Sequence, residues 1–156
     1  MVDFITSILL TVIASGSPIS ELRGGIPLGL SLGLDPSIVI PLAIIVNILI
    51  FFPIYFGLEL LYEKFFSRYA FCRNIVERVS KKGKKYVEKY GVLGLAIFIA
   101  VPFPATGAWT GTLIAWLMRL DWKKSFVAVV LGVLIAGAII SAISLGALAG
   151  LEFLLG

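Results

Sequence analysis

The sequence predicts an all-α integral membrane protein, built as an inverted repeat of two halves joined by a basic amphipathic helix. Each half is expected to hold a re-entrant broken helical hairpin and one full transmembrane helix. Only 14% of the 156 residues are charged and 60% are hydrophobic, whereas a soluble domain carries about 25% charged residues. Two apolar stretches stop about halfway across a bilayer at a proline-bearing break, and the positive charges gather in one cluster.

We expect a single membrane domain over residues 1–156, with a first half at 1–62, a connector at 63–90 and a second half at 91–156. A spanning helix needs about 20 residues, so shorter apolar pieces on both sides of a break predict a hairpin that enters the membrane and returns. In chain order the expected pieces are 3–15 and 19–33 (first hairpin), 37–62 (full span), 63–90 (connector), 91–101 and 107–119 (second hairpin), and 122–154 (second span).

The two breaks read Ser15-Gly16-Ser17-Pro18 and Pro102-Phe103-Pro104-Ala105-Thr106-Gly107. Irregular backbone at membrane depth persists only where it is buried in protein or lines a cavity. Paired broken segments in corresponding halves are typical of a transporter's binding site.

A shift of 86 residues aligns the halves, which predicts an internal duplication. The matching pairs are Leu9/Leu95, Ala14/Ala100, Pro18/Pro104, Gly25/Gly111, Leu34/Leu120 and Asp35/Asp121. The two aspartates precede the full spans, and each is expected to cap the helix that follows.

The positive charges predict the topology. Nine lie in the connector: Lys64, Arg68, Arg73, Arg78, Lys81, Lys82, Lys84, Lys85 and Lys89. If the second hairpin is re-entrant, Arg119, Lys123 and Lys124 join them on one face, and the opposite face carries Asp3, Asp35 and Glu152. The positive-inside rule then makes the connector cytoplasmic and places both termini outside. We expect the protein to lie in the plasma membrane of a prokaryote. The stretch 1–16 lacks Lys and Arg and contains Asp3, which argues against a signal peptide.

The connector has apolar residues at helical spacing between its basic ones, which indicates an interfacial helix. Topology anchoring is the favoured role for it, and recognition of anionic lipid headgroups is the alternative.

His is absent and Cys72 is the single cysteine, which excludes an internal disulfide and a Cys/His zinc site. We expect no cofactor, no nucleic acid partner and no enzymatic activity, because no paired carboxylates or metal ligands converge.

Glu21 and Arg23 are the main candidate site residues, since charge inside a membrane persists when it pairs, faces water or binds something. Two residues apart on a regular helix, they lie about 200° apart, which makes a direct ion pair awkward. We therefore expect unwinding at Gly24-Gly25 or separate partners. A buried pair that holds the hairpin shut is one reading. The other is a proton and substrate site, with Glu21 carrying the proton and Arg23 holding an anion.

Further candidate site residues surround the two breaks: Pro18, Pro27, Pro102, Pro104, Thr106, Gly107, Trp109, Thr110 and Gly111. The second break carries hydroxyls and an indole but no charge, so it is either a second wall of the same cavity or a tightly packed hairpin tip. The stripes Gly25/Gly29/Gly33 and Ala142/Gly146/Gly150 predict helix-packing seams, within one chain or in a homodimer. Asn47, in the first span, favours an interhelical hydrogen bond over a substrate contact. Trp116 and Trp122 fit interfacial anchoring.

The segments 21–29 and 102–111 resemble the small multidrug export protein family of prokaryotes, which is similar to the DedA and VTT superfamily. The resemblance covers essentially the whole chain. It implies paired re-entrant hairpins, movement of lipids such as polyprenyl phosphates and phospholipids, and in some members dependence on the proton motive force. Glu21 matches the acidic position of the first hairpin. The second hairpin departs from the DedA pattern, because Trp109 and threonines stand where DedA proteins carry arginines.

The leading functional prediction is a DedA-like transporter of a lipid or an amphipathic anion, with protons coupled through Glu21. Two alternatives stay open. One is a proton-coupled efflux carrier for hydrophobic cations with Glu21 as the counter-charge, and the other is a membrane scaffold without transport. Membrane lipids and protons are the expected partners.

Site-directed labelling tests the predicted topology. A cysteine that replaces Asp35 should react with an impermeant thiol reagent only from outside, and one that replaces Asp121 only from inside. Reaction of both positions from the same side contradicts the inverted arrangement of the hairpins.

Overall fold

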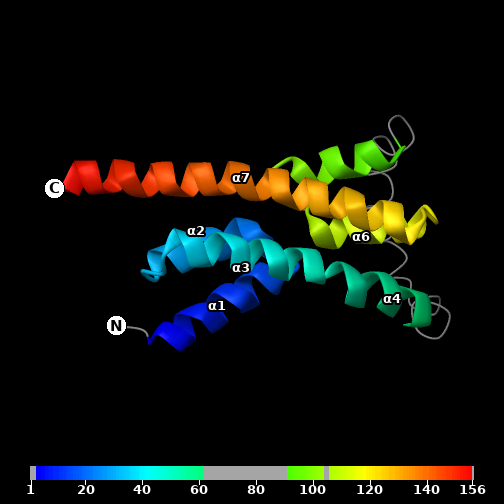
Figure 1. The fold of residues 1–156 in the computed structure, drawn as a ribbon, viewed down its shortest axis with the longest axis horizontal. Coiled ribbons are helices and arrows are strands. Elements are labelled where there is room, and N and C mark those ends of the chain that lie inside the picture. Colours follow the sequence, from blue (N-terminus) through cyan, green and yellow to red (C-terminus); the bar gives the residue numbers. More distant parts are fainter. Residues whose placement is uncertain (1–2, 62–90, 104–105, 156) are drawn as a thin grey trace. The chain divides into compact units, whose positions relative to one another are not determined.

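The computed structural model describes residues 3–61, 91–103 and 106–155 of the chain (Figure 1). These residues form helices and short turns, and none of them lies in a strand. The helices are α1 (Phe4–Gly16), α2 (Glu21–Ser31), α3 (Pro36–Leu49), α4 (Phe51–Leu61), an unlabelled helix Gly91–Ala100, α6 (Ala108–Leu117) and α7 (Trp122–Leu155). The predicted connector helix at 63–90 lies outside the described residues.

Two stretches are long and apolar enough to cross a membrane. They are Pro36–Leu60, where α3 and α4 follow each other with Ile50 between them, and Trp122–Leu151 in α7. Helices α1, Gly91–Ala100 and α6 are apolar but only 10–13 residues long. The predicted alternation of short helices and two full-length helices is therefore confirmed, and the chain is an all-helical membrane protein.

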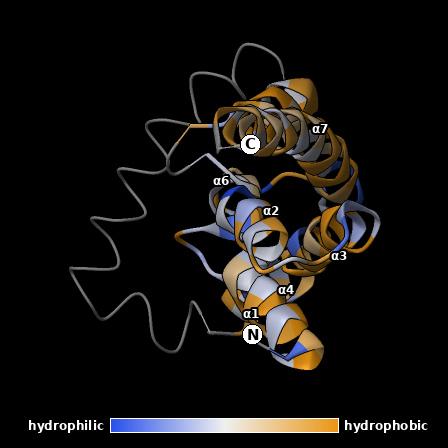
Figure 2. Cartoon of the chain, turned by 90° about the vertical axis from the view of Figure 1, so that its left-hand side faces the viewer, coloured by the Kyte–Doolittle hydropathy of each residue, from blue (hydrophilic) through white to orange (hydrophobic). Residues whose placement is uncertain are grey.

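The surfaces of the helices are apolar, as expected in a lipid environment. Hydrophobic colours run along much of α3 and α7 in Figure 2. In α1 the pattern is inverted relative to a soluble protein. Its buried residues are Ser7, Thr11 and Ser15, whereas Ile5 and Ile13 are exposed. Helix α1 therefore turns its polar side toward other helices and its apolar side outward, which suits contact with lipid tails.

The chain divides into two compact units. Unit 1 comprises residues 1–47 and 134–156, and unit 2 comprises residues 48–133. Unit 1 thus contains α1, α2, nearly all of α3 and the C-terminal part of α7. Unit 2 contains α4, the helix Gly91–Ala100, α6 and the N-terminal part of α7.

In unit 1, α1 and α2 form a hairpin that is closed by the turn 17–20 (Figure 1). The backbone of α2 lies very close to α1 at two glycines. A Cβ atom on Gly25 would lie 1.9 Å from Ser15 Oγ, and one on Gly29 would lie 2.8 Å from both Thr11 Oγ1 and Val39 Cγ1. Glycine at these two positions lets the backbone of α2 approach α1, as the small-residue pattern predicted. Gly33 does not belong to this seam, because it occupies the turn after α2 with a φ of +81° and nothing packs against it.

Helix boundaries repeat at the 86-residue spacing. Helices α2 and α6 end at Ser31 and Leu117, and α3 and α7 begin at Pro36 and Trp122. The turns between them also match. The amide of Leu34 donates to the carbonyl of Gly29 (3.2 Å), and that of Leu120 donates to the carbonyl of Ala115 (3.0 Å). Such bonds satisfy the carbonyl groups at the end of a helix.

Asp35 and Asp121 act as the predicted N-caps. The amide of Ser37 donates to Asp35 Oδ1 (2.7 Å), and the amide of Lys124 donates to Asp121 Oδ1 (3.0 Å). Each bond satisfies one of the free amides at a helix start. The hydroxyl and the amide of Ser37 both donate to Asp35 and hold the pKa of that exposed carboxyl below its usual value.

Burial repeats at the same spacing from α2 and α6 onward. In five pairs at this spacing both residues are buried: Leu22/Ala108, Ile26/Thr112, Val39/Ser125, Ala43/Val129 and Asn47/Val133. The unit boundaries, after Asn47 and after Val133, also differ by 86.

The first helix of each hairpin, α1 and Gly91–Ala100, does not follow the 86-residue alignment, which corrects the predicted pairing of Leu9 with Leu95. Leu9 is 54% exposed, whereas Leu95 is fully buried. Helix α1 ends at Gly16 and the matching helix ends at Ala100, which is a shift of 84, because the second hairpin has the longer turn. Contacts agree with this shift, since Gly25 faces Ser15 and Gly111 faces Ile99.

The glycine seam predicts a steric effect of substitution. Gly25→Val should lower the free energy of unfolding by about 1–3 kcal/mol or prevent folding, because overpacked seams force backbone shifts. Thermal unfolding in detergent measures it. Gly57→Ala is the control, since a Cβ at Gly57 meets nothing within 4 Å and should not lower stability. Equal effects of the two changes contradict the seam.

Candidate functional site

Glu21, the first residue of α2, lies directly after the turn at the tip of the first hairpin. Its amide donates to the carbonyl of Ser17 (3.0 Å), which fastens the turn. Glu21 has a φ of +50°, a left-handed conformation that costs a non-glycine residue about 1–2 kcal/mol. Strained backbone of this kind persists where the surroundings over-determine it and is common at functional sites.

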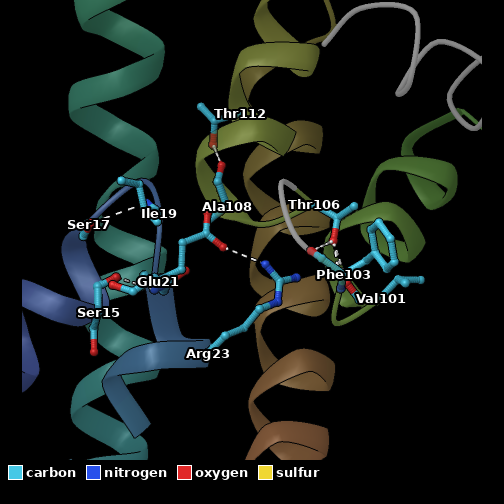
Figure 3. Close-up of polar contacts among 12 residues, drawn as sticks. Ser15, Ser17, Ile19, Glu21, Arg23, Val101, Phe103, Thr106, Ala108 and Thr112 are labelled. Atoms are coloured by element: carbon cyan, nitrogen blue, oxygen red, sulfur yellow. Dashed lines mark hydrogen bonds and ion pairs between the residues drawn. The ribbon is translucent and has the colours of Figure 1, made fainter. Parts of the chain in front are cut away.

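Glu21 and Arg23 form a direct ion pair (Figure 3). Arg23 Nη1 donates to Glu21 Oε2 at 3.0 Å. Glu21 is 4% exposed and the side chain of Arg23 is 19% exposed. A charge-assisted bond in this environment is stronger than one in water.

This pair corrects the expectation that an ion pair would need unwinding at Gly24-Gly25. Both glycines are helical, and the irregular residue is Glu21 itself. A left-handed residue at the helix start redirects its side chain, so the 200° separation of a regular helix does not apply. Pro27 lies within α2, and Pro18 lies in the turn before it.

Three hydroxyl side chains that were not predicted as site residues lie along α1, on the side of the hairpin that leads to this tip. Ser7, Thr11 and Ser15 lie one helical turn apart and are buried. Thr11 Oγ1 donates to the carbonyl of Ser7 (2.8 Å). The i, i+4 spacing of polar residues in an otherwise apolar helix is the signal that could have revealed them.

Asn47 ties the middle of the first span to the end of α1. Its Nδ2 donates to the carbonyl of Ser15 at 2.7 Å, and the residue is fully buried. The predicted interhelical hydrogen bond of Asn47 is therefore confirmed, and its partner is backbone next to the hairpin turn.

The hydroxyls of the second hairpin bond to nearby backbone (Figure 3). Thr106 Oγ1 donates to the carbonyls of Val101 and Phe103 (both 2.7 Å), which stabilises the turn. Thr112 Oγ1 donates to the carbonyl of Ala108 (2.6 Å). Gly107 is the N-cap of α6, Trp109 and Thr110 are part-exposed in its first turn, and Pro102 lies in the turn before it. Pro104 lies outside the described residues.

In both hairpins a glycine of the second helix receives side chains of the first helix, but the side chains differ in polarity. Gly111 corresponds to Gly25, and it receives the side chains of Ile99 and Leu95 where Gly25 and Gly29 receive Ser15 and Thr11. Other charged or polar residues of the first half also have uncharged counterparts at the 86-residue spacing: Glu21/Gly107, Arg23/Trp109 and Asn47/Val133. The glycine of the second hairpin therefore packs against apolar side chains where those of the first pack against hydroxyls.

The structure distributes the candidate residues over both units. Glu21, Arg23 and Asn47 lie in unit 1 with Pro18, Gly24, Gly25 and Pro27, and the described candidates from 102–111 lie in unit 2. The shared cavity that was expected from the two tips stays a prediction.

A cluster of aromatic rings in unit 2 was also overlooked. Phe51 stacks on Tyr55 (ring centroids 5.2 Å apart), and Phe56 packs against Trp122 (6.0 Å). At the end of α4, Trp116 Nε1 donates to Glu59 Oε2 (3.1 Å). Lys123 lies over the ring of Trp122. The cluster joins α4 to α6 and α7 and places rings at one end of each span, as in an interfacial belt.

Comparison with known protein families assigns the chain to one of them. The family model described as "Putative small multi-drug export protein" matches residues 21–139. The chain belongs to this family. The matched segment starts at Glu21 and includes Arg23, Asn47 and the whole second hairpin. No curated protein and no solved structure matches the chain. The family name is that of a membrane transporter, in agreement with the predicted class.

Loss of one partner from the ion pair should destabilise the protein. Glu21→Gln should lower the free energy of unfolding by about 1–3 kcal/mol, because it leaves Arg23 without its counter-charge. Thermal unfolding of the purified protein measures the change. The double variant Glu21→Gln/Arg23→Gln should recover part of the loss, and a double variant less stable than either single variant contradicts the pairing.

Proposed function

We propose that this protein moves an amphipathic anion or an anionic lipid across the membrane, with protons coupled through Glu21. The observation that carries the proposal is the buried Glu21–Arg23 pair at a strained hairpin tip. The second hairpin packs with apolar residues in the corresponding seam. The pair is therefore not a requirement of the hairpin fold, which argues against a purely structural staple.

The charges of the pair favour an anionic substrate. Carboxylate and guanidinium together are neutral. A proton on Glu21 removes the negative charge, and Arg23 then has one positive charge to offer an anion, which it can bind by two hydrogen bonds. Proton and anion binding support each other, and the loaded site is neutral again for a monovalent anion. Such a site lowers the cost of carrying charge through the membrane.

A hydrophobic cation fits this pair less well. It would displace Arg23 from Glu21 and leave a half-buried guanidinium without its counter-charge, since arginine does not deprotonate in proteins. One observation in unit 2 favours the alternative function, efflux of hydrophobic cations. Glu59 carries a carboxylate among Trp116 and the rings of unit 2, and aromatic faces attract organic cations. Lys123 and Lys124, in the first turn of α7, oppose a cation there by charge.

We further propose that both hairpins are re-entrant and that the halves form an inverted, DedA-like repeat. Helix α1 has 13 residues and a length of about 20 Å, less than the hydrocarbon thickness of about 30 Å. Matching helix ends and burial at the 86-residue spacing support the repeat. The same arrangement makes the basic connector cytoplasmic and both termini external in a prokaryotic plasma membrane. A homo-oligomer is compatible with Gly146 and Gly150, where an added Cβ would meet none of the described residues within 4 Å.

Transport in proteoliposomes tests the proposal. The native protein should move a polyprenyl phosphate or an anionic phospholipid, and a pH gradient should accelerate the movement. Glu21→Gln should abolish the response to the gradient, and Arg23→Ala should abolish transport, because each removes one half of the proton and anion site. Asp3→Asn is the matched control, since it removes an exposed carboxylate outside the site, and it should transport normally.

Other outcomes reject the proposal. Proton-driven efflux of a lipophilic cation without movement of any anionic substrate contradicts it, and sensitivity of that efflux to Glu59→Gln would identify the aromatic cluster as the cation site. Absence of all transport, with lower thermal stability of Glu21→Gln as the sole effect, would instead support the scaffold.

A further inference from the structure

Unit 1 contains buried polar atoms that have no hydrogen-bond partner in the protein. Outside the ion pair, and within the described part of the chain, these atoms are Ser7 Oγ, Ser15 Oγ, Asn47 Oδ1 and Ser141 Oγ. All four belong to unit 1. In unit 2, by contrast, the buried hydroxyls of Thr112 and Ser125 donate to the carbonyls of Ala108 and Asp121.

Buried polar groups without partners are costly, at about 1–3 kcal/mol each, and water is absent from the hydrocarbon region to relieve them. In native structures such groups call for a specific explanation. Their confinement to the unit that also holds Glu21 indicates that the explanation is functional.

Two of these atoms lie on a continuous polar face of α1. Ser7, Thr11 and Ser15 follow one another at intervals of four residues, about 6 Å apart along the axis. Ser7 lies near the open end of the hairpin, and Ser15 lies next to the turn that leads to Glu21. Adjacent hydroxyls are separated by about two hydrogen-bond lengths, so one water molecule can bridge each gap once the face is hydrated.

In the present state this face is closed by the glycines of α2. Ser15 Oγ lies against the bare backbone of Gly25, and Thr11 Oγ1 lies against Gly29. Glycine offers no side chain that interlocks with α1 or accepts a hydrogen bond from it. At these two positions, separation of the helices breaks no contact with an α2 side chain, and it would allow the buried hydroxyls to bond to water.

The turn 17–20 is where we place the hinge of such a movement. Glu21, directly after this turn, holds a left-handed conformation that stores strain. Ser20 Oγ donates to the carbonyl of Ala14 and Asn47 Nδ2 donates to that of Ser15, so the end of α1 is held by two side-chain bonds. A change in the turn can shift the hairpin arms without unfolding either helix.

We propose that the hydroxyl face of α1 is the water-lined path by which protons reach Glu21, and that it is closed here by contact with α2. The path opens when α1 and α2 separate. This inference rests on the proposed function in one respect, since Glu21 is the destination of the protons. The hydration of the face is a separate property and can be measured without any substrate.

Cysteine accessibility tests the path. In a Cys72→Ser background, Ser7→Cys should react with a charged methanethiosulfonate reagent, and a pH gradient should make the reaction severalfold faster. Leu95→Cys is the matched control, because Leu95 faces the glycine of the second hairpin, and it should react slowly in all conditions. Leu9→Cys tests the exposed apolar side of α1 and should also stay slow in the lipid bilayer. No reaction at Ser7 under any condition, or equal rates at all three positions, overturns the proposal.

A second variant gives a readout that a structural role would not produce. Ser15→Ala removes a buried hydroxyl that has no partner, so the closed hairpin should become more stable to heat. The same change should slow proton-driven transport severalfold, because the open path loses one bridging group. A stability loss with unchanged transport contradicts the path.

The two proposals fail in different ways. If Glu21→Gln leaves proton coupling intact while Ser7→Cys reacts as expected, the proton role of Glu21 is wrong and the hydrated face stands. If Glu21→Gln abolishes coupling while Ser7 stays unreactive, the path is wrong and the site at Glu21 stands.

Discussion

The close contact between α1 and α2 at Gly25 and Gly29 is the constraint on which the first hairpin depends. Glycine lets the two backbones approach until the hydroxyls of Ser15 and Thr11 lie against α2. That contact buries the polar side of α1 and leaves its apolar side for lipid. It also forces a short turn, and the short turn accompanies the left-handed conformation of Glu21. Membrane helices associate through such packing because lipid supplies little hydrophobic drive between them.

The second hairpin shows what this architecture requires and what it does not. Its glycine, Gly111, accepts Ile99 and Leu95, and its buried hydroxyls bond to backbone carbonyls. The helix ends, caps and buried positions that follow match those of the first half. Since equivalent packing is achieved there without charge, the ion pair and the hydroxyl face of the first hairpin are additions to the shared framework.

Much of the framework follows from local sequence. Proline-bearing breaks, aspartates before the spans and apolar stretches of limited length predicted the helices within a few residues, because caps and breakers act over one turn. The pair Glu21 and Arg23 was recognised by charge, and Asn47 by its polarity within a span. The hydroxyl face of α1 was overlooked because serine and threonine are common in membrane helices, and their burial depends on a neighbour. The pairing of Leu9 with Leu95 was wrong because the two turns differ in length.

The sequence by itself determined that the chain is a helical membrane protein with short helices beside two spans, and that its strongest candidate charges lie at the first break. Those properties depend on composition and on spacing along the chain. The tertiary structure decided that Glu21 and Arg23 contact each other, that α1 buries its hydroxyls, and that Asn47 bonds to the carbonyl of Ser15. Each of these depends on a backbone conformation or on a contact between helices, neither of which spacing along the chain specifies.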